Sequence, residues 1–302
     1  MHITIPRGPI ELAAELHLPH DLDETAPLPA VVLSTPGSSV KEQIGANYAS
    51  RLAARGIAAL VFDPAYQGQS GGEPRDLEDP YQRSEDLSYA IDALTALPGI
   101  DPHRIGILGI CAGGGYAIHV ARTDHRIKAV GAVDPGEIGA SFRGFQADGP
   151  VAALDRLAEA RIEEVRTGVL TRENWLPDTM ADAEAACVTD VDLLQAITYY
   201  RTERGYNEHS TNRRLSRGDT LLLGYDAFHL VDLLMTQPLL LILAENLEGT
   251  GFDTAGERLW KLAPNPVERV IIPGARHYEM YDVEEYVNPA VDRLATFYAD
   301  NL

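Results

Sequence analysis

The sequence predicts an α/β protein in which a mainly parallel central sheet is flanked by helices and carries an inserted helical cap. Over residues 1–135, short apolar runs alternate with helical patterns, as in strands joined by right-handed helical crossovers. The alternation stops over residues 136–235, where no clear buried strand is found, and it resumes over residues 236–302. We therefore assign residues 1–135 and 236–302 to one core domain and residues 136–235 to the cap.

The first elements follow from the period of the apolar side chains. Residues 10–18 alternate apolar and polar side chains, the period of a half-buried strand, and are expected to form a hairpin with residues 3–5. A polar, Pro-rich loop is expected at residues 19–29. Continuous apolar runs predict buried strands, and segments of helical period lie between them. The predicted strands are 30–33, 57–62, 105–110 and 128–133, and the predicted helices are 42–55 and 84–97.

The cap is predicted to be helical. Apolar residues recur there at the spacing of one helix face, as Val151, Leu154, Ala158, Ile162 and Val165. A second helix is predicted at 191–200, with Thr189 or Asp190 as its N-cap. The core then closes with strands at 238–244 and 267–272 and helices at 254–262 and 287–298.

Composition and charge limit the class of protein. The chain has 302 residues, 45% of them hydrophobic, and a formal net charge of −20. This charge repels phosphate backbones, so nucleic acid is not expected as a partner. The first residues lack a signal-peptide apolar region and no apolar run is long enough to span a membrane, so we expect a cytoplasmic protein without a membrane partner. The oligomeric state stays open, and a homodimer is one candidate.

The two cysteines, Cys111 and Cys187, do not make a disulfide framework. Cys187 lies in the cap without a nearby His and is expected to be a packing residue. No spacing among Cys, His and acidic residues indicates a metal site, so neither a metal nor a cofactor is expected.

A reactive side chain is predicted at the turn that follows the strand at 105–110. Residues 109–113 read Gly-Ile-Cys-Ala-Gly, which is the pattern G-x-S-x-G with Cys111 in the place of Ser. Small residues two positions to either side allow the strand and the next helix to close on each other. The alternative is an ordinary Gly-rich turn with an inert, buried cysteine.

A cysteine nucleophile needs a base, a group that orients the base, and donors for the oxyanion. His277 follows the last predicted strand and is the expected base. For the acid we choose Glu248, in the middle of the loop after the strand at 238–244, with Glu245 and Asp253 as alternatives. An exposed acidic loop without a catalytic role competes with this choice.

The expected oxyanion donors are two backbone N–H groups. One belongs to Ala112, directly after the cysteine, and the other to Ser38, in the loop after the strand at 30–33. Gly37 allows the backbone of that loop to approach a substrate closely. An ordinary turn at residues 36–38 is the alternative.

Together these segments resemble the α/β-hydrolase fold, and within it the dienelactone-hydrolase-like group that includes proteins labelled polyketide transferases. The resemblance spans most of the chain and implies acyl transfer or hydrolysis on esters, lactones or thioesters, without metal or cofactor. Many relatives carry Asp where we choose Glu248. The segments that carry the resemblance are 40–43 (Val-Lys-Glu-Gln), 68–75 (Gly-Gln-Ser-Gly-Gly-Glu-Pro-Arg), 109–116, 199–202 (Tyr-Tyr-Arg-Thr), and His277 with 280–282 (Met-Tyr-Asp).

The expected function is that of a cysteine-nucleophile acyl hydrolase or acyltransferase. His277, held by Glu248, takes the proton of Cys111, the thiolate attacks a carbonyl, and the acyl-Cys passes to water or to a hydroxyl. The expected partner is a small-molecule acyl substrate with a hydrophobic acyl group, since the cap is apolar and aromatic, and polyketide-type metabolism is one setting. A binding or scaffolding protein without turnover is the alternative, and a peptidase ranks below it.

Overall fold

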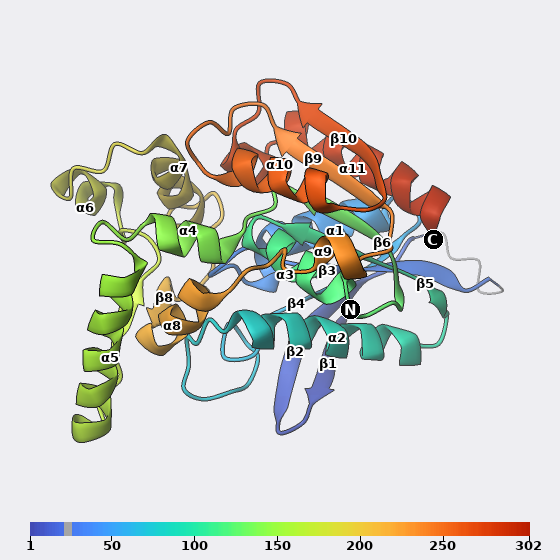
Figure 1. The fold of residues 1–302 in the computed structure, drawn as a ribbon. Helices are drawn as coiled ribbons and strands as arrows, with labels where there is room; N and C mark the ends of the chain where they lie inside the picture. Colours follow the sequence, from blue (N-terminus) through green and yellow to red (C-terminus); the bar gives the residue numbers. More distant parts are fainter. Residues whose placement is uncertain (21–25) are drawn as a thin grey trace.

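An eight-stranded sheet forms the centre of the computed structural model, which describes residues 1–20 and 26–302 (Figure 1). In spatial order, the first two strands form an antiparallel hairpin, and the second strand also pairs antiparallel with the third. Every later pair of neighbouring strands is parallel. The predicted α/β fold with a mainly parallel sheet is thus confirmed. In spatial order the strands are β1 (His2–Arg7), β2 (Ile10–His17), β4 (Ala58–Phe62), β3 (Leu28–Ser34), β5 (Ile100–Ile110), β6 (Ile127–Val133), β9 (Leu239–Ala244) and β10 (Pro266–Ile272).

Helices cover both faces of this sheet. The core helices are α1 (Ala46–Ala53), α2 (Pro80–Ala96), α3 (Ala112–Ala121), α10 (Phe252–Leu262) and α11 (Glu284–Asn301), with a π-helical turn η1 (Lys41–Gly45) and a 3-10 helix η2 (His277–Tyr281). α1 packs against α11, and α2 packs against α3. Each of these pairs supplies the apolar cover of one sheet face, as the predicted alternation of strands and helices requires.

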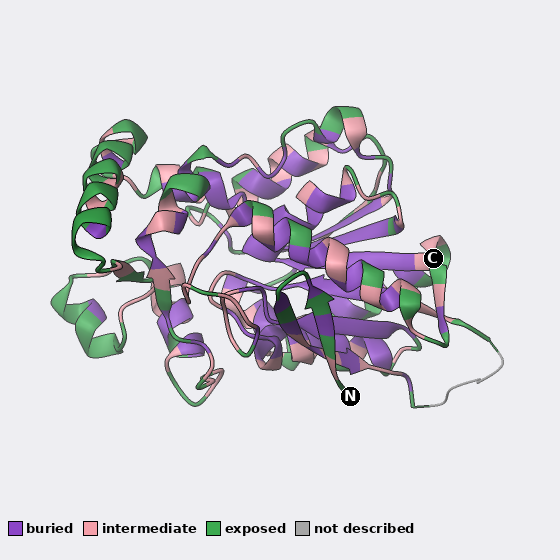
Figure 2. Cartoon of the chain, turned by 90° about the horizontal axis from the view of Figure 1, so that it is seen from below, coloured by how far each residue is buried: buried purple, intermediate pink, exposed green. Residues whose placement is uncertain are grey.

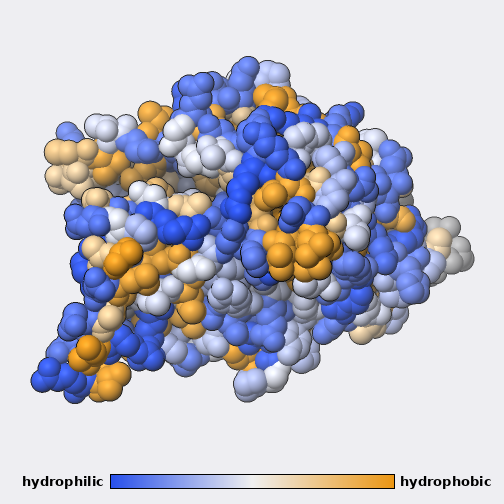
Figure 3. Space-filling model, viewed as in Figure 1, coloured by the Kyte–Doolittle hydropathy of each residue, from blue (hydrophilic) through white to orange (hydrophobic). Residues whose placement is uncertain are grey.

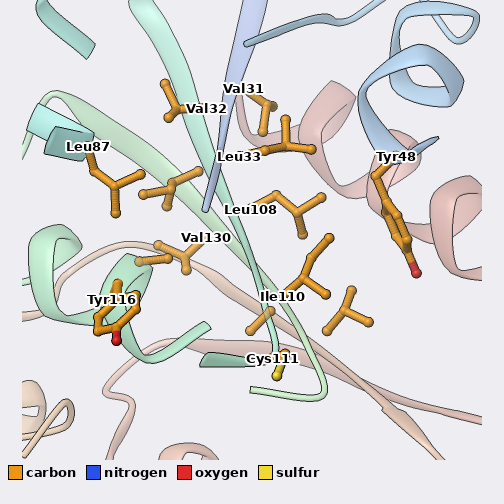
Figure 4. Packing of buried hydrophobic residues seen from close by; sticks show 14 of the residues in the cluster. Val31, Val32, Leu33, Tyr48, Leu87, Leu108, Ile110, Cys111, Tyr116 and Val130 are labelled. Carbon is orange, nitrogen blue, oxygen red and sulfur yellow. The ribbon is translucent and has the colours of Figure 1, made fainter. Parts of the chain in front are cut away.

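The apolar core is continuous through the sheet. The central strands are buried on both faces, as the purple strands of Figure 2 show. Figure 4 places Tyr48 of α1 on one side of these strands and Leu87 and Tyr116, from α2 and α3, on the other. Burying one Leu or Val side chain contributes about 1.5–3 kcal/mol relative to leaving it exposed. In the same view Cys111 lies just beyond Ile110, where β5 leaves the core.

Some boundaries differ from the sequence prediction. The helix expected at 42–55 begins instead with the π turn η1 before α1 continues it. α10 begins at Phe252 rather than at residue 254, because Gly251 adopts the left-handed conformation at its N-cap (φ 84°) and turns the chain earlier. Of the loop expected at 19–29, residues 21–25 lie outside the described residues, and β3 already begins at Leu28.

The segment between β6 and β9 is mainly helical and lies beside the core at the left of Figure 1. Asp190 caps α7 by accepting the N–H of Leu193 at 2.9 Å, which confirms one of the two expected N-caps. A two-stranded antiparallel sheet, which the sequence does not predict, pairs residues 172–174 with residues 213–215 inside this segment. Its elements are α4 (Ile138–Gly144), α5 (Pro150–Thr167), β7 (Arg172–Asn174), α6 (Met180–Ala185), α7 (Val191–Tyr200), β8 (Arg213–Leu215), α8 (Ser216–Gly224) and α9 (Val231–Leu234).

Among the described residues, no helix combines the length and the apolar character needed to cross a lipid bilayer.

Candidate active site

The turn between β5 and α3 holds Cys111 in a constrained conformation. Its φ is 57° and its ψ is −129°, a region that a residue other than glycine rarely adopts. A Cβ at Gly113 would lie 2.1 Å from the carbonyl oxygen of Ser34, and one at Gly109 would lie 2.6 Å from the carbonyl oxygen of Gly113. Both positions therefore require glycine, which confirms that the strand and the next helix can close on each other only with small residues two positions to either side of Cys111.

Cys111 opens onto a cavity of about 580 Å³. The side chain is buried apart from this opening, with 9% of the residue exposed. Two backbone hydrogen bonds fix its position: its N–H donates to the carbonyl of Val133 at 3.1 Å, and its carbonyl accepts from the N–H of Gly136 at 2.7 Å. The end of β6 and the loop after it therefore hold the turn in place.

His277 is the first residue of η2 and is fully buried. Its ring stacks on the ring of Phe252, with 3.9 Å between centroids and an interplanar angle of 8°. Nε2 lies 3.2 Å from the hydroxyl oxygen of Tyr281, at the other end of η2. The imidazole is thus clamped on one face and at one nitrogen, so its rotamer is defined before any substrate arrives.

The carboxylate nearest to His277 belongs to Asp134, directly after β6. Oδ2 of Asp134 lies 3.6 Å from Nδ1 of His277, and both side chains are closed off from solvent. The other oxygen, Oδ1, accepts the backbone N–H of Ala244 at 2.8 Å, and the backbone N–H of Asp134 donates to the carbonyl of Ile242 at 2.9 Å. β9 therefore aims this carboxylate at the imidazole.

The structure does not bring Glu248 to His277, so the choice of Glu248 as the orienting acid is corrected. Glu248 is exposed and lies with Arg276 in a separate, smaller hollow. Glu245 accepts the N–H of Gly274 at 2.7 Å, and Asp253 accepts the N–H of Thr254 at 2.7 Å. All three acids follow β9. The position beside Nδ1 of His277 is instead occupied by Asp134, which follows β6.

Opposing influences set the pKa of His277. Burial of the ring lowers the pKa, whereas the charge of a Cys111 thiolate, the Asp134 carboxylate and the charge of Asp192 raise it, and the pKa lies well above its ordinary value. A negative charge on Cys111 and a positive charge on His277 would therefore stabilise each other.

Three tyrosines lie close to Cys111 and His277. Burial and then the negative charge of a Cys111 thiolate raise the pKa of Tyr200, Tyr278 and Tyr281 well above the ordinary value. Their hydroxyls consequently stay protonated and neutral beside the sulfur. For Tyr200, interactions with the side chains of Tyr281 and Ser39 oppose this rise in pKa.

Both backbone groups expected to bind an oxyanion border the cavity. Ala112 is the first residue of α3, so its N–H has no partner within the helix. Ser38 has a φ of 59° and lines the same cavity, and its N–H has no partner within the described chain. Both residues thus line the cavity onto which Cys111 opens, and neither N–H has a competing acceptor among the described residues. Their role in binding an oxyanion stays a prediction.

The rest of the cavity wall is mostly apolar and comes from the segment between β6 and β9. The apolar and aromatic residues of this wall are Ile138, Phe142, Phe145, Trp175, Leu176 and Leu193. Asp192 adds a carboxyl group whose pKa is raised, first by burial and then by the charges of Asp190 and Asp134.

Some functional residues escaped the sequence analysis. Asp134 carries a usable signal, because it directly follows the predicted strand at 128–133, and the carboxyl ends of parallel strands meet at one edge of the sheet. Tyr281 lies four residues after His277, one turn further along η2, but nothing in the sequence distinguishes it from Tyr278. Cys187, expected to pack inside the cap, is instead exposed.

No group of three or more His, Cys, Asp or Glu side chains within the described ranges is arranged to hold a metal ion.

Comparison with known proteins places this geometry in a family context. The model of the alpha/beta hydrolase family matches residues 36–289. The chain is 36% identical over 296 residues to the uncharacterized protein YcjY of Escherichia coli, covering 97% of this chain and 95% of YcjY. It superimposes on the crystal structure of the hypothetical protein PA2218 from Pseudomonas aeruginosa with a TM-score of 0.89 and 28% identity, covering 100% of this chain and 93% of that one.

A shorter match concerns a relative whose name states an activity. The chain is 36% identical over 134 residues to the thiohydrolase aneE of Aspergillus aculeatus, covering 44% of this chain and 42% of aneE.

Proposed function

The chain belongs to the alpha/beta hydrolase family, and from this premise we propose that it is a cysteine-dependent acyl hydrolase or acyltransferase. Its substrate on this proposal is a thioester, ester or lactone with a hydrophobic acyl group of polyketide type. One observation carries the proposal. Cys111 lies on a strained turn at a cavity, a negative charge on Cys111 raises the pKa of the buried His277, and the carboxylate of Asp134 lies 3.6 Å from Nδ1 of that ring. A structural cysteine needs neither the strain nor the buried charges.

In the first step the proton of Cys111 resides on Nε2 of His277, and the thiolate attacks the carbonyl carbon of the substrate. A carbon–sulfur bond forms while the carbonyl π electrons move to oxygen, where the N–H groups of Ala112 and Ser38 bind the negative charge. One such donor lowers the barrier by about 3 kcal/mol. The bond to the leaving group then breaks, and that group takes the proton from His277.

In the second step His277 accepts a proton from water or from an alcohol, which attacks the acyl-Cys carbonyl. The bond between carbon and the sulfur of Cys111 breaks, and the thiolate is restored beside the imidazolium. Asp134 keeps Nδ1–H of His277 oriented through both steps, because its own carboxylate is held by the backbone of β9. Water gives hydrolysis, and a hydroxyl of the substrate itself gives a lactone.

The substrate class rests on the cavity and on one relative. The wall of the cavity is mostly apolar, which favours an acyl chain over a charged or peptide ligand. The name thiohydrolase, given to aneE, favours a thioester as the activated group.

Intact-protein mass spectrometry tests the proposal. The protein is mixed with the N-acetylcysteamine thioester and the p-nitrophenyl ester of octanoic acid, and adduct mass and product are followed. We expect an octanoyl adduct on Cys111, and a loss of product formation of about 1,000-fold or more in Cys111→Ala. Cys187→Ser is the matched control, since that thiol is free and exposed, and it is expected to behave like the unchanged protein.

The outcome also separates the rival functions. Product formation that survives in Cys111→Ala would exclude the cysteine mechanism. Tight binding of the thioester without an adduct or a product would favour a binding protein that kept the fold. Turnover of octanoyl substrates with rapid loss of the adduct points to hydrolysis, whereas a stable adduct that is released by an added alcohol points to acyl transfer.

A further inference from the structure

A buried arginine bonds to the loop that carries Ser38. Hydrophilic residues cover most of the face drawn in Figure 3, as expected when charged side chains stay in water. Arg83, in the first turn of α2, differs from this pattern, because only 5% of it is exposed. A buried arginine is costly unless its charge is paired and its N–H groups are bonded. The identity of its partners therefore bears on why this position is charged.

Arg83 donates to two backbone carbonyl oxygens of the loop after β3. Its Nη2 lies 2.6 Å from the carbonyl oxygen of Thr35 and 3.3 Å from that of Pro36, which lines the cavity. The carbonyl of Thr35 also faces the turn after β5, since a Cβ at Gly113 would lie 2.6 Å from that oxygen. Arg83 thus fixes the loop at the place where it leaves β3 and packs against the turn.

The guanidinium of Arg83 is itself held in place. Its Nε lies 3.7 Å from Oε1 of Glu78, which is fully buried, and the Tyr116 hydroxyl donates to the same oxygen at 2.7 Å. The guanidinium carbon lies 4.9 Å from the centre of the Tyr116 ring. Glu78 therefore balances the charge of Arg83, and Tyr116 of α3 restricts its rotamer. The arginine is a fixed support for the loop.

The same loop has a second anchor, in the segment between β6 and β9. The hydroxyl of Ser210 donates to the carbonyl oxygen of Ser38 at 2.8 Å. The Ser38 N–H belongs to the peptide group that joins Gly37 to Ser38, and the peptide groups on either side are held through the carbonyls of Pro36 and Ser38. The left-handed φ of Ser38, 59°, is costly for a residue other than glycine and persists only where the surroundings fix it. Arg83 and Ser210 provide that fixation from two sides.

We propose that Arg83 and Ser210 are positioning residues, which hold the Ser38 N–H where the oxyanion forms. The inference rests on the proposed function, in which that N–H binds the negative charge of the oxyanion. Neither side chain has to touch the substrate for this, because each acts through a backbone carbonyl. Displacement of a catalytic group by about 1 Å can lower a rate about 100-fold. The alternative is that the two side chains only stabilise the fold.

Two reactions of Cys111 separate positioning from folding. Acylation by the octanoyl thioester passes through an oxyanion, whereas alkylation by iodoacetamide forms a carbon–sulfur bond, releases iodide and passes through no oxyanion. We therefore expect Arg83→Met to slow single-turnover acylation about 100-fold and to leave the alkylation rate unchanged. Ser210→Ala removes one neutral hydrogen bond and should slow acylation about tenfold, again without an effect on alkylation.

Arg7→Met and Ser84→Ala are the matched controls. Arg7 is 7% exposed and pairs with Asp86, so its removal also takes a buried arginine from a buried carboxylate. Ser84 is as buried as Ser210, and its hydroxyl donates at 2.9 Å to a carbonyl within α2. Among the described residues, neither control side chain bonds to the loop after β3. Both controls should keep the acylation and alkylation rates of the unchanged protein.

The outcomes separate this inference from the proposed function. Equal loss of both rates in Arg83→Met would show a folding role and overturn the inference, as would unchanged acylation in Arg83→Met or Ser210→Ala. If Arg83→Met does not fold, Arg83→Lys decides for that residue. It keeps a charge beside Glu78 but lacks the planar set of donors, so acylation should still be slowed tenfold or more. An unchanged protein that the thioester does not acylate at Cys111 would contradict the proposed function, and the inference with it.

Discussion

The Asp134 carboxylate lies 3.6 Å from Nδ1 of His277, although the two residues come from the ends of different, non-adjacent strands. β6 and β10 are separated in the sheet by β9, and the backbone of β9 holds Asp134 in place. The arrangement makes the acid part of the rigid sheet edge instead of a mobile loop. A rigidly held carboxylate orients an imidazole at little entropic cost.

Asp134→Asn tests that relationship. The substitution keeps the shape but removes the charge that helps to raise the pKa of His277, so less thiolate forms at Cys111. We expect kcat/KM on the octanoyl thioester to fall about 10- to 100-fold, less than the roughly 10,000-fold loss for the acid of a Ser–His–Asp triad, because a thiol ionises more easily than a hydroxyl. The pH at half-maximal alkylation by iodoacetamide should rise. Glu248→Gln is the control, and an equal loss in that variant would return the assignment to Glu248.

Tyr281→Phe tests the contact at the other ring nitrogen. In the proposed mechanism His277 is protonated and both ring nitrogens donate, so the Tyr281 hydroxyl, 3.2 Å from Nε2, would accept from Nε2–H and stabilise the charged ring. Removing the hydroxyl should lower the pKa of His277 and move the alkylation midpoint to higher pH by less than Asp134→Asn does. Tyr206→Phe, which removes a hydroxyl from an exposed tyrosine, should leave that midpoint in place. Identical midpoints in all three proteins would contradict the assigned hydrogen bond.

Buried tyrosines predict a loss of folding stability in alkali. Burial raises the pKa of Tyr48, Tyr116 and Tyr298 above the ordinary value of 10.0. Above pH 10 the unfolded chain therefore loses these protons while the folded chain keeps them. Each such group lowers the free energy of unfolding by about 1.4 kcal/mol per pH unit, from pH 10 upward. Thermal unfolding midpoints between pH 8 and 11 check this, and Tyr48→Phe should make the decline less steep.

Gly113→Ala tests the packing of the turn. The new methyl group would lie 2.1 Å from the carbonyl oxygen of Ser34, and backbone cannot move aside as a side chain does. We expect a loss of stability of about 3 kcal/mol and an inactive turn, measured by chemical denaturation and by labelling of Cys111. Gly144→Ala is the matched control because its methyl group meets nothing within 4 Å. Equal stability of the two variants would show that the turn tolerates bulk.

The sheet and the strained turn at Cys111 could be predicted from the sequence for physical reasons. A strand buried on both faces must be apolar throughout, so β3 to β6 are visible as continuous runs. The turn at Cys111 is visible because its close packing excludes every side chain at Gly109 and Gly113. His277 follows from its place after the last strand. In each of these cases the packing constraint acts on residues that are neighbours in the sequence, so the pattern of residue types reveals it.

Two features could not be predicted in this way: which carboxylate orients His277, and what lies against the apolar face of α5. Several carboxylates follow the ends of strands, and only the three-dimensional arrangement of β6 and β9 determines that Asp134 meets His277. The helical period of Val151 to Val165 shows that an apolar face exists, but a period contains no information on what lies against it. Both questions concern contacts between segments that are distant in the chain.

The position of the segment between β6 and β9 has a consequence for how this enzyme could diversify. Cys111, Asp134 and His277 follow strands of the sheet, whereas most of the apolar lining of the cavity belongs to the segment between β6 and β9. On the proposed function, replacing that segment would alter which molecules are accepted while the reacting atoms keep their places. Proteins that keep these three residues on the sheet but differ between residues 138 and 234 should therefore perform the proposed reaction on different compounds.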